Sequence, residues 1–412
     1  MHKYKEEQIY LDYAATTPCD DRVLLEMFDA FKNNFGNPNS LHKYGENAMT
    51  SLSIARSHVC NLLNVNNHEI IFTSGATESI NIAISRSIQK LSKSGKNHLI
   101  TFKTEHKATI DAAKSLERSG MVVDMLGVTN EGLINFDELE KKITSSTAMI
   151  SVCYVNNETG VLQDAERLVA LCRKYSVLLH LDATQALGKI PIDLSCLDVD
   201  MLSASGHKIY GPKGIGILFC RKKHQSLIRM PLGNLDVEYG IRSGTPPVPL
   251  CVGLGEATKI AKKEMLSDLA RITDLRNKFI SGITSQIPEI YINGCQESNY
   301  PGIINMSFRG CEGEALMMEA NKIAIASGSA CTSNKLTISH VLDAMGVKHD
   351  IAQSSLRISI GKYTNEQDID IAIDNLVNAT KKLRSISPVW DMIQEGVDLD
   401  EFFKDSIDHH NH

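Results

Sequence analysis

Short apolar runs alternate with segments of helical length through the first half of the chain. Strands joined in this way are parallel neighbours, because a helix must carry the chain back to the edge of the sheet where the first strand began. We therefore predict an α/β fold with a mainly parallel sheet covered by helices on both faces. The predicted strands are residues 69–73, 98–101, 122–126, 148–154 and 177–182.

The pattern changes near Val252, in a chain whose 412 residues are enough for two domains. A helical pattern with charged residues along one face runs from about Leu254 to Ile287 and predicts a connector into a second, smaller domain. The elements predicted there are strands 303–308 and 355–360 and helices 313–320 and 366–385.

Composition excludes several classes of function. A formal charge of −6 gives no general basic surface, so we expect no direct nucleic-acid binding. The polar start and the lack of any long uncharged apolar run predict neither a secretory signal nor a membrane span. The ten cysteines form no CxxC pair, which is typical of reduced thiols, and we expect a cytoplasmic protein without a metal site.

Lys208 stands among small and hydroxylated residues, directly before a glycine-punctuated turn and the apolar run 215–219. A lysine that forms a Schiff base must be partly desolvated so that some of its amine is unprotonated. Ser205 and His207 lie close enough in sequence to bind an anionic group beside it. A covalent or cofactor role and a plain turn lysine are equally compatible with these residues alone.

A second candidate is the turn 74–77, Ser-Gly-Ala-Thr, between a predicted strand and a predicted helix. Free N–H groups at the start of a helix and a threonine hydroxyl favour a bound phosphate. The alternative is an ordinary helix start with Ser74 or Thr77 as its N-cap.

Asp182 ends one predicted strand and His106 follows another, at the sheet edge where open α/β folds bind ligands. A carboxylate there can keep a pyridine nitrogen protonated, and an imidazole can stack on a flat ring or move a proton. The alternatives are a capping aspartate and a structural histidine.

Cys331 and Arg357 are the candidates in the second domain. Cys331 lies in a small, polar run that predicts an accessible thiol, which is either a nucleophile or an incidental loop cysteine. Cys153 and Cys220 fall in apolar strands and are interpreted as inert. Arg357 interrupts a strand and needs an anionic partner, which is either a substrate carboxylate or a structural salt bridge.

Together these residues resemble the pyridoxal-phosphate-dependent cysteine desulfurases of the IscS/NifS type, in the class V aminotransferase group. The similarity runs from Tyr10 to Met392, and its most specific segments are 205–208 (Ser-Gly-His-Lys), 242–245 (Arg-Ser-Gly-Thr) and 327–333 (Ser-Gly-Ser-Ala-Cys-Thr-Ser). The resemblance implies a fold-type I pyridoxal-phosphate transferase with a mainly parallel seven-stranded sheet in a large domain and a smaller α+β domain. Residues 14–260 would form the large domain. Residues 1–13 and 261–412 would form the small one, with the catalytic cysteine loop at about 325–337 and a partner-docking C-terminal tail.

The resemblance also implies individual roles. Lys208 would bind the cofactor as a Schiff base and move the substrate's Cα proton, while His106 would stack on the ring and assist. Cys331 would attack the substrate's sulfur. The remaining cofactor and substrate contacts implied are Asp182 with the ring nitrogen, Gln185 with the phenolic oxygen, Gly75, Ala76, Thr77, Ser205 and His207 with the phosphate, Thr245 from the second subunit of a homodimer, and Asn157 and Arg357 with the substrate carboxylate, Asn157 being also part of the cofactor site.

The implied activity is conversion of L-cysteine to L-alanine, with sulfur held as a persulfide for iron–sulfur scaffold proteins and tRNA-thiolation carriers. One stretch, 232–240, lacks the glycine run of this family, whose glycines tolerate positive φ. That departure suggests an alternative, a desulfurase-like subunit of low activity that acts mainly by binding partners. A selenocysteine lyase is a further alternative, which the retained Cys331 disfavours.

Overall fold

A computed structural model of the chain describes residues 8–230, 238–327 and 338–397. Its centre is a seven-stranded sheet in which β4, β3, β5, β6 and β7 run parallel to one another, whereas β8 is antiparallel to both β7 and β2. The predicted α/β fold with a mainly parallel sheet is therefore confirmed. Across the sheet, the strands are β2 (Ile70–Thr73), β8 (Gly216–Cys220), β7 (Met201–Ser205), β6 (Leu178–Asp182), β5 (Thr147–Cys153), β3 (His98–Phe102) and β4 (Val122–Leu126).

Helices cover both faces of this sheet, and each face has its own apolar core. A π-helical turn, Ile82–Arg86, joins α3 to α4 so that they form one continuous helix. One face carries α3 (Ala76–Asn81), α4 (Ser87–Leu91), α5 (Lys107–Arg118) and α8 (Gln225–Ile228). The other carries α2 (Lys43–Leu63), α6 (Phe136–Lys142), α7 (Ala165–Tyr175) and the first part of α9 (Val248–Thr284), with α1 (Asp21–Asn33) against α9.

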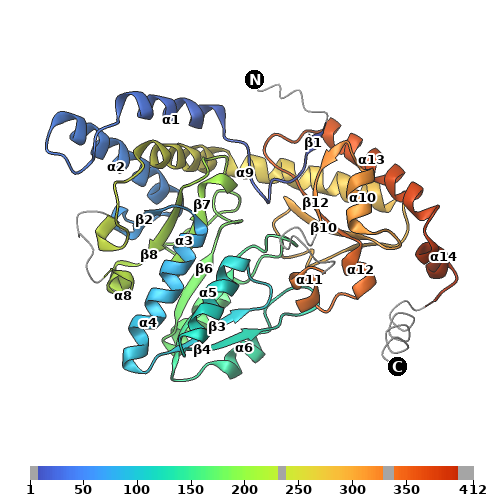
Figure 1. Cartoon of the computed structure of the whole chain (residues 1–412), viewed down its shortest axis with the longest axis horizontal. Coiled ribbons are helices and arrows are strands. Elements are labelled where there is room, and N and C mark those ends of the chain that lie inside the picture. The colour runs from blue at the N-terminus through green and yellow to red at the C-terminus, as the bar shows by residue number, and fades with distance from the viewer. Residues whose placement is uncertain (1–7, 231–237, 328–337, 398–412) are drawn as a thin grey trace.

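Helix α9 runs across the upper part of the molecule in Figure 1, below α1, from the large sheet to a second, four-stranded antiparallel sheet. The second sheet has the order β12 (Ala326–Ser327), β13 (Ser355–Ser359), β10 (Ile303–Phe308) and β9 (Ile290–Ile292). Its own apolar core takes residues from the second part of α9, from these strands and from Leu11. Leu11 therefore packs with residues of the second half of the chain.

A short parallel pair of strands, β1 (Ile9–Tyr10) and β11 (Ile323–Ala324), also joins the start of the described chain to this second part. The remaining helices of this part are α10 (Gly313–Glu319), α11 (His340–Ala344), α12 (His349–Gln353), α13 (Glu366–Arg384) and α14 (Pro388–Gln394). None of the described helices combines the length and the apolar character needed to cross a bilayer.

Candidate active site

A cavity of about 750 Å³ opens at the carboxyl ends of the central parallel strands. Cys153, Asp182 and Ser205 end β5, β6 and β7, and all three line it. Parallel strands bring their carboxyl ends to one edge, which is why residues far apart in sequence meet there. The predicted site residues that line this cavity are Gly75, Ala76, Thr77, His106, Asn157, Asp182, Gln185, Ser205, His207, Lys208 and Arg357.

Lys208 follows β7 in a single 3-10 turn, Gly206–Lys208. Its Nζ lies 2.7 Å from the carbonyl oxygen of Ala14 and 2.6 Å from that of Ala15, and donates to both. The N-terminal turn thus holds the amine at the cavity wall. A plain surface lysine would have no such contacts, so the cavity position favours the cofactor role over the turn role.

His207 lies beside Lys208 and is neutral at physiological pH. Burial, reinforced by the positive charges of Lys208 and Lys213, lowers the pKa of His207 to about 4. Its Nδ1 lies 3.1 Å from the hydroxyl of Thr16. A neutral imidazole here contributes hydrogen bonds to the cavity but no positive charge.

Asp182 is 2 % exposed at the end of β6. Its Oδ1 accepts a hydrogen bond from the Thr184 amide at 2.9 Å and a second from the Thr184 hydroxyl. Asp182 therefore caps the following turn and lines the cavity, so both predicted interpretations describe part of its environment. Thr184, which fixes the carboxylate, was not singled out from the sequence.

The start of α3 differs from the capped start considered above. Gly75 is the N-cap, with φ 155°, and no side chain caps the helix, so the expectation of Ser74 or Thr77 as N-cap is wrong. The backbone is closely packed at this helix start, since a Cβ added to Gly216 in β8 would lie 2.6 Å from the Gly75 Cα. Without a capping side chain, the first N–H groups of the helix are left for another partner at the cavity.

His106 is the N-cap of α5, and its Nδ1 accepts a hydrogen bond from the Ala108 amide at 3.1 Å. Burial lowers the pKa of His106; the nearby carboxylate of Asp182 opposes this shift and the charge of Lys208 adds to it. An acceptor Nδ1 at a helix start also disfavours protonation. The ring is thus neutral and carries its hydrogen on Nε2.

Arg357 lies in β13, is 8 % exposed and lines the cavity. One terminal nitrogen pairs with the Asp12 carboxylate at 2.8 Å, and the other donates to the Asn157 carbonyl oxygen at 3.2 Å. Among the described residues, its buried Nε has no partner. The guanidinium therefore forms a structural salt bridge and also faces the cavity, and its role in binding substrate stays a prediction.

Two ionisable residues next to the cavity were missed by the sequence analysis. Glu105 precedes His106, and burial raises the pKa of its carboxyl well above the usual value, which favours the protonated form. Its Oε1 accepts the Cys153 amide at 2.8 Å. Lys189 lies behind Gln185 and donates to its Oε1 at 2.6 Å. Their only sequence signal was proximity to His106 and Gln185.

The other two predicted site residues are Thr245 and Cys331. Thr245 is exposed and is not among the residues that line the cavity. Cys331 falls outside the described residues. Among the described residues, Cys153 is the cysteine that lines the cavity, and burial raises the pKa of its thiol well above the usual value, so it stays protonated and unreactive.

The stretch 232–240 that departs from the family pattern is described only at its end, Glu238–Gly240. Glu238 is buried and pairs with Arg56 at 2.7 Å. Tyr239 adopts φ 58°, the left-handed region in which glycine is otherwise favoured.

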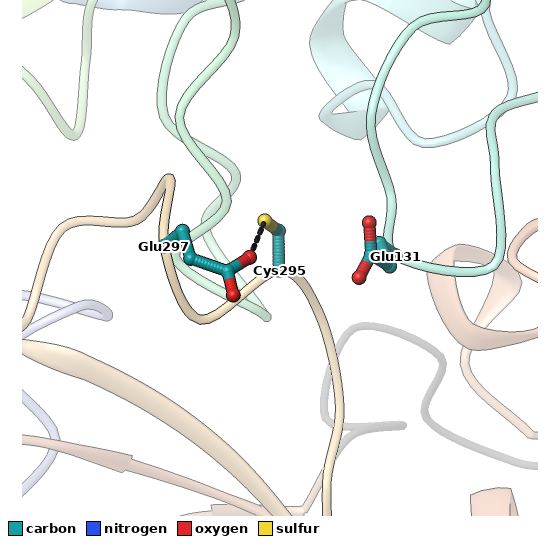
Figure 2. Close-up of side chains that lie close together, drawn as sticks. All are labelled: Glu131, Cys295 and Glu297. Carbon is teal, nitrogen blue, oxygen red and sulfur yellow. Dashed lines mark hydrogen bonds between the residues drawn. The ribbon is translucent and has the colours of Figure 1, made fainter.

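Outside the cavity, one group of three possible metal ligands occurs in the described part of the chain. The ligand atoms of Glu131, Cys295 and Glu297 all lie within 4.8 Å of one another (Figure 2). Both carboxylates are exposed, and the Cys295 thiol already lies 3.6 Å from Glu297 Oε2. The Cys295 thiol therefore already has a hydrogen-bond acceptor in Glu297.

Comparison with known proteins places this site in a family. Residues 9–371 match the family described as aminotransferase class V. The chain belongs to this family. It is 46% identical over 394 residues to the cysteine desulfurase IscS of Mannheimia succiniciproducens, which covers 95% of this chain and 97% of that protein. It is 47% identical over 394 residues to the protein of the same name from Salmonella schwarzengrund, with the same coverage. The resemblance to IscS/NifS-type cysteine desulfurases is confirmed.

Solved structures agree with this class-V aminotransferase assignment. A NifS-like protein superposes with a TM-score of 0.84 at 36% identity, over 91% of this chain and 100% of that one. A structure described as SspA in complex with cysteine gives a TM-score of 0.76 at 33% identity, over 86% of this chain and 99% of that one. The fold-type I architecture and the pyridoxal phosphate cofactor predicted from the sequence follow from membership of this family.

Proposed function

We propose that this protein is a cysteine desulfurase, which converts L-cysteine to L-alanine and takes the sulfur onto an enzyme thiol. One observation carries the proposal: the Lys208 amine and the Asp182 carboxylate line one cavity, in a chain 47% identical to a cysteine desulfurase over 95% of its length. A solved relative whose description names bound cysteine supports the substrate.

The residues around the cavity fit pyridoxal phosphate. An uncapped helix start beside Ser205 offers N–H groups to a phosphate, and a buried carboxylate at the end of the neighbouring strand β6 suits a protonated ring nitrogen. Bound there, the cofactor supplies an electron sink for negative charge at the substrate's Cα. The proposed contacts are Gly75, Ala76, Thr77, Ser205 and His207 to the phosphate, Asp182 to the ring nitrogen, Gln185 to the phenolic oxygen, His106 and Asn157 to the ring region and Lys208 to the aldehyde carbon.

Proton movement falls to Lys208 and His106. The Lys208 amine lies at the cavity wall beside the Ala14 and Ala15 carbonyl oxygens, and we assign it the proton at the substrate's Cα. His106 uses Nδ1 to cap α5, so its Nε2 is the atom left to donate or return a proton. Arg357 and Asn157 would hold the substrate carboxylate, which must share the guanidinium with Asp12.

In the sulfur-transfer step, sulfur passes from the substrate to an enzyme thiol. The Cβ–S bond of cysteine breaks, a bond forms between that sulfur and the Sγ of Cys331, and the thiol's proton is balanced by the proton gained by alanine. The products are alanine and an enzyme persulfide, so no external oxidant is needed. Cys153 is excluded as the acceptor because burial raises its thiol pKa and thereby suppresses the thiolate.

We also propose a cytoplasmic homodimer in which Thr245 completes the partner's phosphate site. Its exposure in one subunit supports this, as does an apolar surface on and after α1, where Leu25, Phe28, Phe31 and Phe35 are 60–70% exposed. Residues 14–260 form the proposed cofactor domain, and 1–13 with 261–412 form the small domain, which the separate apolar cores support. Iron–sulfur scaffold proteins and tRNA-thiolation carriers are the proposed sulfur acceptors.

The test is a single-turnover reaction of the full chain, loaded with pyridoxal phosphate and given L-cysteine without an acceptor. Alanine and protein-bound persulfide should appear in equal amounts. Cys331→Ala should abolish the persulfide while the cofactor stays bound, and Cys196→Ala, at an exposed cysteine, should match the wild type. Persulfide formation that survives Cys331→Ala refutes the assignment of the acceptor thiol.

A further inference from the structure

Lys189 stands immediately behind the cavity and is not part of its lining. It follows Gln185 by one helical turn, since the Leu187 amide bonds to the Ala183 carbonyl and the Ile190 amide to the Ala186 carbonyl. Residues four apart in such a turn lie on one face. Lys189 Nζ accordingly reaches Gln185 Oε1 at 2.6 Å.

The contact with Lys189 fixes the orientation of the Gln185 carboxamide, that is, which side carries the oxygen and which the nitrogen. A carboxamide can be turned over, exchanging its oxygen and nitrogen, unless its partners distinguish them. In its charged form the lysine can only donate, so it requires the oxygen. The Ala14 carbonyl can only accept, so it requires the nitrogen, which lies 2.7 Å from it. Both partners therefore impose the same orientation.

The orientation leaves one amide hydrogen for the cavity. The Gln185 nitrogen carries two N–H groups, and the Ala14 carbonyl takes one of them. Among the described residues, no partner takes the second, and Gln185 lines the cavity. Ala14 also accepts from Lys208, so Lys189, Gln185, Ala14 and Lys208 form one continuous hydrogen-bonded chain.

The position is a costly one for a lysine. Burial, with the nearby charges of Lys208 and Arg357, lowers the pKa of Lys189 to about 7. Its Nζ also lies 5.5 Å from the ring centre of Tyr300, a buried residue in the loop before β10. A lysine with no task at this place would be better replaced by an apolar residue, because its charge is both desolvated and repelled.

We propose that Lys189 is a positioning residue of this active site: it holds the Gln185 carboxamide so that one amide N–H faces the cavity as a hydrogen-bond donor. The inference rests on the proposed function, in which that donor meets the phenolic oxygen of pyridoxal phosphate. Lys189 itself touches neither cofactor nor substrate.

The experiment is a double-mutant cycle on the affinity of the full chain for pyridoxal phosphate. Lys189→Met and Gln185→Met should each weaken binding about tenfold, because each removes the oriented hydrogen bond from the Gln185 N–H to the cofactor. Because both act on one contact, the double variant should also lose only about tenfold, where independent effects would multiply to about a hundredfold. Lys189→Gln, which still offers an N–H to Gln185 Oε1, should stay within about threefold of wild type.

Lys174→Met is the matched control, at an exposed lysine paired with Glu140, and should leave the affinity unchanged. A hundredfold loss in the double variant, or unaltered binding by folded Lys189→Met, overturns the inference. If Lys189→Met does not fold, Gln185→Glu tests the same arrangement, because it keeps an acceptor for Lys189 and lacks the N–H; retained affinity would then refute it. A wild-type protein that binds no pyridoxal phosphate would instead refute the proposed function.

Discussion

Replacing Glu238 by glutamine should destabilise the protein severely, although the two side chains have nearly the same shape. The Glu238 carboxylate is buried and accepts from both terminal nitrogens of Arg56, at 2.7 and 3.1 Å, and from the Phe72 amide of β2 at 2.8 Å. Arg56 is also buried and lies 4.7 Å from the Phe72 ring centre. The pair therefore links α2, β2 and the turn Glu238–Gly240.

The expected cost follows from what the substitution leaves behind. Glutamine keeps one acceptor oxygen, but its NH₂ group faces a donor, and the Arg56 charge loses its buried counter-charge. Removing one partner of a buried ion pair costs about 3–5 kcal/mol. A typical domain has a total stability of about 5–15 kcal/mol, so this is a large fraction.

Urea unfolding followed by circular dichroism measures the difference. Glu46→Gln is the control, because the Lys43–Glu46 pair is exposed, with side chains 80% and 61% accessible, and should change stability by less than about 1 kcal/mol. Arg56→Met combined with Glu238→Met should recover part of the loss, since no uncompensated charge remains. A Glu238→Gln variant within about 1 kcal/mol of wild type would refute this reasoning.

Two further predictions concern the cofactor site and acid stability. Gly216→Ala places a Cβ 2.6 Å from the Gly75 Cα and should lower pyridoxal phosphate affinity at least about tenfold. Gly127→Ala, whose Cβ meets nothing within 4 Å, should leave the affinity unchanged. Titration of the cofactor's absorption band measures both affinities. Hydrogen bonds from Arg22 and Lys362 lower the pKa of Glu264 from 4.5 to about 2. The contribution of Glu264 to folding stability is thus complete above pH 4.5 and lost as pH falls to about 2. The difference in stability between wild type and Glu264→Gln should therefore close over that window in acid unfolding curves. A difference that stays constant would contradict this expectation.

The strand content of the large sheet was predictable wherever the strand was a continuous apolar run. Strand β7 was missed because Asp200, just before it, and Ser203, within it, are polar. The structure buries these groups against partners that are distant in sequence: Asp200 accepts from Arg173 and from the Leu179 amide, and Ser203 bonds to His180. The antiparallel direction of β8 is set by its pairing with β2 and β7, which no local pattern encodes.

The site was predictable where a residue type at a strand end already limits the chemistry, as for Asp182 and Lys208. Lys189 was not, because a Gly-Lys pair in a turn resembles a surface lysine. Its environment depends on Tyr300, more than a hundred residues away, and on the charges of Lys208 and Arg357. Only the folded chain brings these groups together.

The central claim is that this cavity performs cysteine desulfuration through Lys208. The most direct measurement is the release of alanine from L-cysteine by the cofactor-loaded wild type and by Lys208→Ala, each checked for folding by circular dichroism. We expect catalytic alanine release by the wild type and none above background by the variant. Equal release by both proteins, or none by a wild type with bound cofactor, would contradict it.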